Sequence, residues 1–160
     1  MSVRLSEEEV WAFLEAGHTG IVTTLRADGW PVSLPVWYVV LDQRIYVMTP
    51  AHTRKVARIR ADERACFLVE RGEAWTELAA VELAVRASIV ATEAEEVATA
   101  LSGFAAKYAA YRPAPVRLPK ATTKHYSTQA VIRLDPIEPA LSWDNARIRL
   151  ATGNKETTDT

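Results

Sequence analysis

The sequence predicts a mainly β, antiparallel fold with flanking helices, and three observations support this prediction. Apolar residues alternate with other residues over positions 32–40 and 81–89, which is the period-two pattern of half-buried strands. Short turn sequences at 27–29 and 71–73 separate consecutive strand patterns, as expected for antiparallel hairpins. Helical spacing of apolar residues is confined to three segments before or between the strands.

The first helix is marked by a capping box from Ser6 to Glu9, and apolar residues follow at helical spacing until Gly17. We expect this helix to pack as a lid on the strands. The strands themselves are expected over 20–25, 31–41, 45–49, 64–70, 76–90 and 128–134.

A later helix is expected from Glu93 to about Tyr108. Four apolar residues recur there on one stripe, namely Val97, Leu101, Phe104 and Tyr108. The following segment, 111–119, contains three prolines and is expected to be irregular. We expect residues 1–150 to form one domain and residues 151–160 to be a disordered tail, because the tail has almost nothing to bury.

The bulk composition narrows the classes of function. Nineteen basic and twenty acidic side chains leave a formal net charge of −1, which argues against the basic footprint of a nucleic-acid-binding protein. No apolar stretch approaches the roughly 20 residues of a membrane span, and the N-terminus lacks a signal peptide's features, so we expect a cytoplasmic protein without a membrane partner. The single cysteine, Cys66, lies in an apolar strand pattern and is expected to be a small buried side chain rather than a nucleophile.

The second helix carries positive charge where a helix normally disfavours it. Thr53 has the character of an N-cap, so Arg54 and Lys55 fall in the first turn, and Arg58 follows one turn after Arg54. A helix N-terminus is already positive, and its unpaired amide groups favour an anion. The pattern therefore indicates a site for a phosphate or a carboxylate, with a solvated basic surface helix as the alternative.

Catalytic signatures are mostly missing from the sequence. The three histidines show no metal-like spacing with one another or with Cys66, so we expect no metal site. The sequence also contains no G-x-S-x-G, P-loop or G-x-G-x-x-G motif. Of the five tryptophans, three lie at turns or element ends, where an aromatic side chain often lines a pocket or an interface: Trp30, Trp75 and Trp143.

Several of these stretches, in this order, resemble one known family. The stretches are 23–29 with Pro31, Val36-Trp-Tyr38, Thr53-Arg-Lys55 continuing through 60–64, and Ser142-Trp-Asp144. Over about Leu5 to Asp144 the chain resembles the pyridoxamine 5'-phosphate oxidase-like split β-barrels, the flavin and deazaflavin oxidoreductases. Within them it is most similar to the branch that uses the deazaflavin coenzyme F-420 rather than to the FMN-holding vitamin B6 oxidases. The fold that this implies is an FMN-binding-like, antiparallel split β-barrel.

The resemblance also implies a cofactor site in a homodimer, with two equivalent sites at the interface. Thr53, Arg54 and Lys55 match the family's phosphate-binding segment, and Met48 and Thr49 match a neighbouring strand end. Trp143 matches a segment late in the family's sequence that approaches the cofactor. Because the two sites lie at the interface, this segment can come from the second subunit. The strand beneath the tricyclic ring is matched by Ser33, Leu34, Pro35 and Val36.

Three functions remain open on this basis. The first is a reductase that passes a hydride from F-420 to a small, apolar or conjugated substrate, with no dedicated catalytic residue and with Tyr38, His52 or water as the proton source. The second is an FMN-dependent oxidoreductase, which the resemblance favours less because Ala80 replaces the glutamine with which the B6 oxidases contact FMN. The third is a non-enzymatic module that stores or carries a cofactor.

Overall fold

The computed structural model describes residues 2–111, 120, 122 and 128–148. The expected C-terminal tail and all of the proline-rich segment except Tyr111 lie outside the described residues. The described part of the chain contains seven strands: β1 (Thr19–Leu25), β2 (Pro31–Leu41), β3 (Arg44–Pro50), β4 (Arg64–Arg71), β5 (Ala79–Val90), β6 (Gln129–Pro136) and β7 (Leu141–Asp144).

The strands form an antiparallel barrel, so the predicted mainly β, antiparallel fold is confirmed. Their order is β4-β1-β2-β3-β6-β5-β7, and an additional pairing of β4 with β5 closes the first six into a barrel. The seventh strand, β7, is appended to β5. Along each barrel strand, apolar side chains at alternate positions point inward, and these side chains meet in one core. Burial of this shared core stabilises the closed barrel.

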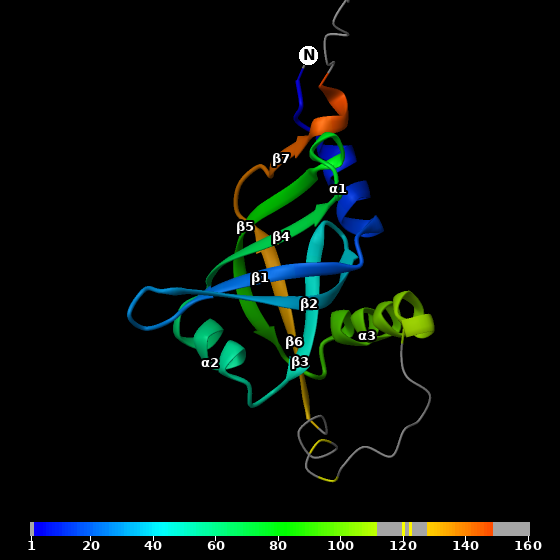
Figure 1. Ribbon diagram of the computed structural model, residues 1–160. Coiled ribbons are helices and arrows are strands. Elements are labelled where there is room, and N and C mark those ends of the chain that lie inside the picture. Colours follow the sequence, from blue (N-terminus) through cyan, green and yellow to red (C-terminus); the bar gives the residue numbers. More distant parts are fainter. Residues whose placement is uncertain (1, 112–119, 121, 123–127, 149–160) are drawn as a thin grey trace, which may run out of the picture.

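Helices α1 (Glu7–Ala16) and α2 (Arg54–Ala61) lie on opposite sides of the barrel (Figure 1). The apolar stripe of α1 joins the barrel core through Val10, Phe13 and Leu14, so the expected lid is present. The short helix α2 buries Val56 and Ile59.

The third helix, α3 (Glu95–Lys107), covers the outside of β2 and β3 (Figure 1). Its stripe differs from the predicted one, because Leu101 is 42% exposed whereas Ala100 is fully buried. Val97, Ala100 and Phe104 contact the barrel at a spacing of i, i+3 and i+7, and the helix begins two residues later than expected. The small side chain of Ala100 fits where the helix approaches the strands closely.

The N-terminal segment lies along the free edge of β7. The Asp144 amide donates to the Val3 carbonyl, and the Leu5 amide donates to the Ser142 hydroxyl at 3.2 Å. Among the described residues, no helix is long and apolar enough to cross a membrane.

Candidate functional site: a basic corner at the start of α2

The start of α2 is an incompletely capped helix terminus. Thr53 occupies the N-cap position with extended backbone angles, as predicted, but its side chain makes no capping hydrogen bond. The Thr53 Oγ1 atom is buried and has no hydrogen-bond partner in the described part of the chain. A hydroxyl group in this position usually accepts a bond from the second or third helical amide, so this one is available to another group.

Arg58 approaches the same corner from the next turn of α2. Its Nε donates to the Thr24 hydroxyl of β1 at 2.8 Å, which holds the guanidinium against the barrel. Its Nη2 is buried without a hydrogen-bond partner among the described residues. A buried, unsatisfied donor costs on the order of 1–3 kcal/mol and more when it is charged, so this arrangement favours an external acceptor.

Lys55 is the third basic group of the corner and is half-buried. Burial, followed by repulsion from Arg58, lowers the pKa of the Lys55 ammonium. The first turn of α2 contains no acidic residue. Within the part of the chain that the structure describes, none of Arg54, Lys55 and Arg58 forms an ion pair. Arg54 differs from the other two because its side chain is exposed.

We name the group formed by Thr53, Lys55, Arg58 and Thr24 the basic corner. Two cations, an orphaned hydroxyl and the positive end of a helix converge there without an anionic partner among the described residues. A phosphoryl group supplies both the negative charge and several acceptor oxygens, so its chemistry fits this set of donors.

Four residues of β2 are predicted to contact the tricyclic ring of the coenzyme, and they divide between the two faces of the strand. Val36 belongs to the barrel core, and Leu34 lies on the same inward side, opposite Val22, but remains 39% exposed. Ser33 and Pro35 lie on the outer side, where the Ser33 hydroxyl lies 2.8 Å from that of Thr23.

Met48 and Thr49 also point to different sides of their strand. Met48 packs partly buried against the residues beneath α3, whereas Thr49 is 5% exposed on the side of the barrel core. Strand β3 ends at Pro50, three residues before Thr53, so the chain passes from Thr49 directly to the basic corner.

Trp143 lies apart from the basic corner within one chain. It is on β7, opposite Ala80, whereas α2 lies at the other end of the barrel (Figure 1). The indole is partly exposed, at 36%. A single chain therefore does not bring Trp143 to the corner, and its participation requires a second copy.

Tyr38, one of the expected proton sources, is a packing residue. Its ring is fully buried, its hydroxyl donates to the Leu14 carbonyl at 2.6 Å, and burial raises the pKa of the phenol well above its ordinary value. His52 is an exposed residue directly before the N-cap.

Cys66 is half-buried on the outer side of β4 rather than fully buried, and burial together with Glu82 raises the pKa of its thiol to about 11. A thiol with that pKa remains protonated and unreactive near neutrality.

The site residues predicted from the sequence did not include Thr24 or Arg58. The sequence already indicated Arg58 as part of the charge cluster, but not its burial. Thr24 is 1% exposed and lies on the inward face of β1 with Val22. A threonine at an inward position of an otherwise apolar alternation was the available signal, because a buried hydroxyl needs a partner.

Comparisons with known proteins agree with this fold. A family model described as pyridoxamine 5'-phosphate oxidase matches residues 6–138. The structure of Rv2991, a conserved hypothetical protein from Mycobacterium tuberculosis, is similar, with a TM-score of 0.75, 25% sequence identity and 96% of each chain covered.

Two further solved structures share the fold at lower identity. A FAD-binding protein from Mesorhizobium loti has a TM-score of 0.65 and 19% identity, over 86% of this chain and 93% of that chain. HutZ, the haem storage protein from Vibrio cholerae, has a TM-score of 0.68 and 14% identity, over 89% of this chain and 96% of that chain. A comparison with curated proteins gave no match.

Proposed function

The chain belongs to the pyridoxamine 5'-phosphate oxidase family, and from this premise we propose that it is an oxidoreductase that uses the deazaflavin coenzyme F-420 to transfer a hydride to a small, largely apolar or conjugated substrate. The observation that carries this proposal is the basic corner. Its buried donors lack partners among the described residues, and a phosphorylated coenzyme would supply the missing acceptors.

The residues that would hold the coenzyme phosphate are Thr53, Lys55 and Arg58, with Arg54 at the exposed rim. Thr24 keeps the Arg58 guanidinium in place through its 2.8 Å hydrogen bond. Leu34, which lies on the inward face of β2 and is 39% exposed, would extend the site from this corner, and the buried Val36 and Thr49 would support it from inside the barrel. Ser33 and Pro35 on the outer face of β2, and Met48 beneath α3, would contribute through the backbone of their strands.

When bound, the coenzyme would supply the hydride, so the protein needs only to bind, orient and shield the reactants. Tyr38 is too deeply buried to supply a proton. Water or His52 therefore remains as the proton source in this proposal. Apart from this proton, the side chains of the site would act by positioning alone.

The preference for F-420 over FMN comes from the sequence resemblance and from Ala80. This residue is 1% exposed and lies on β5 between Glu70 and Trp143. An alanine offers no polar side-chain atom to a flavin ring at the position that the B6 oxidases fill with glutamine. FMN is the second candidate, because a FAD-binding protein shares the fold.

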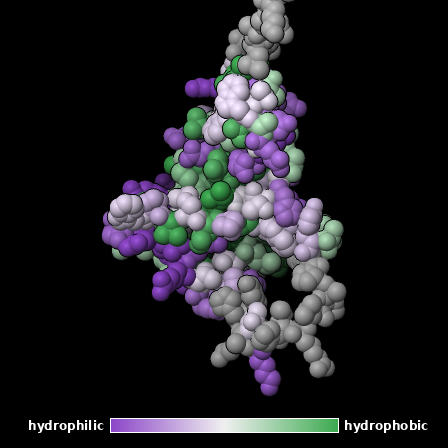
Figure 2. Space-filling model, viewed as in Figure 1, coloured by the Kyte–Doolittle hydropathy of each residue, from purple (hydrophilic) through white to green (hydrophobic). Residues whose placement is uncertain are grey.

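We also propose that two copies of the chain form the complete site. Directly paired residues on neighbouring strands point to the same side. One such row crosses the barrel wall that α1, α2 and α3 leave uncovered (Figure 1). The row consists of Pro35, Ile21, Leu68, Glu82 and Leu141. Figure 2 shows apolar side chains gathered on this face, over β1 and β4.

This uncovered row supports a second copy as the partner. Four of its five members are apolar, and Leu141 is 54% exposed. Apolar side chains grouped on an outer face are typical of interaction sites. The row ends on β7, the strand that carries Trp143, so a copy docked on this face would bring the Trp143 of one chain toward the ring-contacting strand of the other.

Fluorescence titration of the purified protein with F-420 and, separately, with FMN tests the proposed coenzyme. We expect saturable binding of F-420 at lower concentration than FMN, followed by reduction of a conjugated acceptor under single-turnover conditions. Preferential FMN binding would favour the second candidate. Tight binding without turnover with any acceptor would instead indicate a carrier module.

Sedimentation velocity tests the proposed dimer. Replacing Ile21 with glutamate places a charge in the middle of the uncovered row and should convert a dimer to monomers. The matched control is Leu101→Glu, which adds the same charge at an exposed apolar residue of α3. A wild-type monomer, or dissociation by both variants alike, would contradict this interface.

A further inference from the structure

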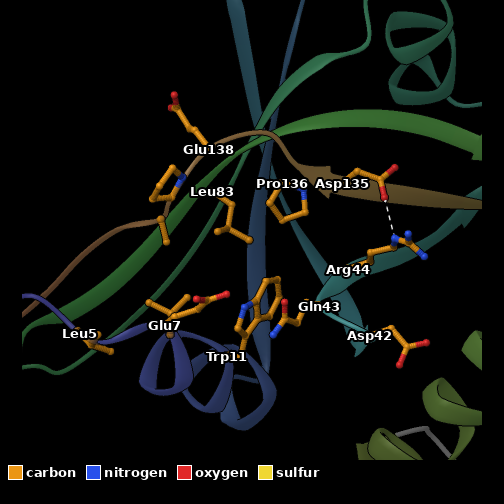
Figure 3. Close-up of a pocket in the computed structure, with 13 residues that line it drawn as sticks. Leu5, Glu7, Trp11, Asp42, Gln43, Arg44, Leu83, Asp135, Pro136 and Glu138 are labelled. Atoms are coloured by element: carbon orange, nitrogen blue, oxygen red, sulfur yellow. Dashed lines mark ion pairs between the residues drawn. The ribbon is translucent and has the colours of Figure 1, made fainter.

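A cavity lies beside α1, away from the basic corner. It has a volume of about 670 Å³, which is within the range of small-molecule sites. It is bounded by α1, by the β2–β3 turn and by the segment that leads from β6 toward β7 (Figure 3). Because α1 and α2 lie on opposite sides of the barrel, this cavity is separate from the proposed coenzyme site (Figure 1).

The wall of this cavity combines an apolar floor with an aromatic ring. Leu83 on β5 and Val10 on α1 are core residues whose side chains also face the cavity, and Pro136 extends the apolar surface. The indole of Trp11 stands on the α1 side, next to Gln43 (Figure 3). An indole face attracts organic cations, and a surface of this composition accepts an apolar body.

The charged residues of the cavity are mainly acidic. Four carboxylates contribute to the lining, whereas Arg44 is the single basic side chain there. Arg44 is bound to Asp135 at 3.1 Å, so its charge is already compensated. The other three carboxylates form no ion pair with a described residue, and they belong to Glu7, Asp42 and Glu138.

Glu7 is the carboxylate closest to the middle of the cavity in Figure 3, where it reaches toward the space between Leu83 and Trp11. Asp42 and Glu138 stand farther out, on opposite sides of the opening. A bound molecule could therefore place a positive group near Glu7 while its apolar part lies against the floor.

The wall opposite α1 is rigid because of its turn and its ion pairs. Asp42 and Gln43 both have positive φ angles, 48° and 57°, which fixes the tight β2–β3 hairpin. Asp135 bridges Arg44 and Arg133, and Arg133 in turn binds Glu96 of α3 at 3.0 Å. This network holds the polar wall in place without a ligand, so the cavity is largely preformed.

We propose that this cavity binds a small organic cation, an amine with an aromatic or aliphatic body. Three features together define the ligand class: an apolar floor, the Trp11 face and an excess of carboxylates without an ion-pair partner among the described residues, of which Glu7 lies nearest the middle of the cavity. An anion would meet repulsion from the same carboxylates. The site is independent of the proposed coenzyme chemistry, because its residues are not part of the basic corner.

Titration of the full-length, ¹⁵N-labelled protein with phenethylamine at pH 7 tests this proposal. The indole signal of Trp11, identified from the spectrum of Trp11→Phe, should shift saturably with phenethylamine, which is a cation at this pH. The anion 3-phenylpropionate, which has a similar apolar body, should not shift it. A saturable shift confined to this indole is the expected result.

Two matched variants test the role of charge. Glu7→Gln should weaken phenethylamine binding roughly two- to fivefold, as expected for one partly exposed ionic contact. Glu8→Gln removes the same charge from the same helix turn but lies outside the cavity lining, so it should leave affinity unchanged. Equal effects of the two variants, equal binding of the two probes, or no shift of the Trp11 signal up to about 10 mM phenethylamine would each overturn the proposal.

Discussion

Lys55 is expected to lower the stability of the ligand-free protein while strengthening anion binding, so one substitution should change the two properties in opposite directions. Replacing Lys55 with methionine keeps the length of the side chain and removes its charge. In the ligand-free protein this charge is partly desolvated and repelled by Arg58, as the lowered pKa of Lys55 shows. If Lys55 served only to stabilise the fold, Lys55→Met would instead lower the unfolding free energy of the ligand-free protein.

The expected magnitudes follow from the environment of Lys55. Its ammonium is only half-buried, so solvent screening limits the gain in unfolding free energy of Lys55→Met to at most about 1 kcal/mol at pH 7. Because folding lowers this pKa, the penalty is fully present at neutral pH, begins to shrink as the pH rises past the pKa of the folded state, and is gone above the pKa of the unfolded state. Loss of a charge-assisted phosphate contact should cost roughly 1.5–3 kcal/mol of binding, or about ten- to a hundredfold in affinity.

Urea unfolding with and without inorganic phosphate measures both effects in one assay. Phosphate at about 100 times its dissociation constant should add about 2.7 kcal/mol to the wild-type protein, and roughly 1.4 kcal/mol to a variant that binds tenfold more weakly. Sodium chloride at the same ionic strength controls for general salt effects. Arg60→Met is the matched variant, since Arg60 is an exposed cation two residues after Arg58 and therefore points to nearly the opposite side of α2.

Two outcomes would refute this reasoning. Lower stability of ligand-free Lys55→Met would show that the ammonium already has a stabilising partner. An unchanged phosphate response, equal to that of Arg60→Met, would remove Lys55 from the anion site.

Three further substitutions test the packing around the site and the fold. Tyr108→Phe should lower the unfolding free energy by about 1–3 kcal/mol in thermal or urea unfolding. The Tyr108 hydroxyl lies 2.8 Å from both the Tyr38 and the His18 carbonyl oxygens, between which it shares its one proton, and it accepts a hydrogen bond from the Tyr38 amide. Gly20→Ala should cost a similar 1–3 kcal/mol, since an added Cβ would lie 2.3 Å from the buried ring of Phe67. Lys107→Met should stabilise the protein at pH 7, because burial lowers the pKa of Lys107 to about 8. The gain should stay below about 1 kcal/mol, since solvent screening and loss of the cation–π contact between the Lys107 ammonium and the Tyr38 ring, 4.0 Å away, both reduce it. That advantage should shrink in unfolding measurements between about pH 8 and 10.5, where the folded wild-type protein loses its proton first.

Local sequence signals predicted the elements of the fold well. The alternation over 32–40 belongs to β2, which begins and ends where expected, and the capping box at Ser6 marks the start of α1. Both signals depend on neighbouring residues alone. The position of α3 was less accurate, because Leu101 fits the helical period but faces solvent and the smaller Ala100 takes its place. The rotation of α3 about its own axis as it packs on the barrel decides which of these two neighbouring residues is buried.

The sequence predicted the positive charge of the candidate site but not the arrangement of its side chains. The unusual cations of the first turn identified Lys55, since a helix start disfavours them in any fold. The pairing of Thr24 with Arg58 joins residues 34 positions apart, and barrel closure alone brings them together. The cavity beside α1 depends in the same way on segments far apart in the sequence, so no local pattern indicated it.

Closure of the barrel leaves little backbone for another chain to extend. Each of the six barrel strands has a neighbour on both sides, although residues 31–37 of β2 pair with β1 alone and include Pro31 and Pro35, which lack an amide donor. The seventh strand is only four residues long, with the segment around Val3 to Leu5 along its outer edge. Exposed strand edges are the usual templates for fibrillar aggregation and strand exchange. Copies of this protein should therefore associate through side-chain surfaces, which can separate and re-form, rather than through continuous intermolecular sheets.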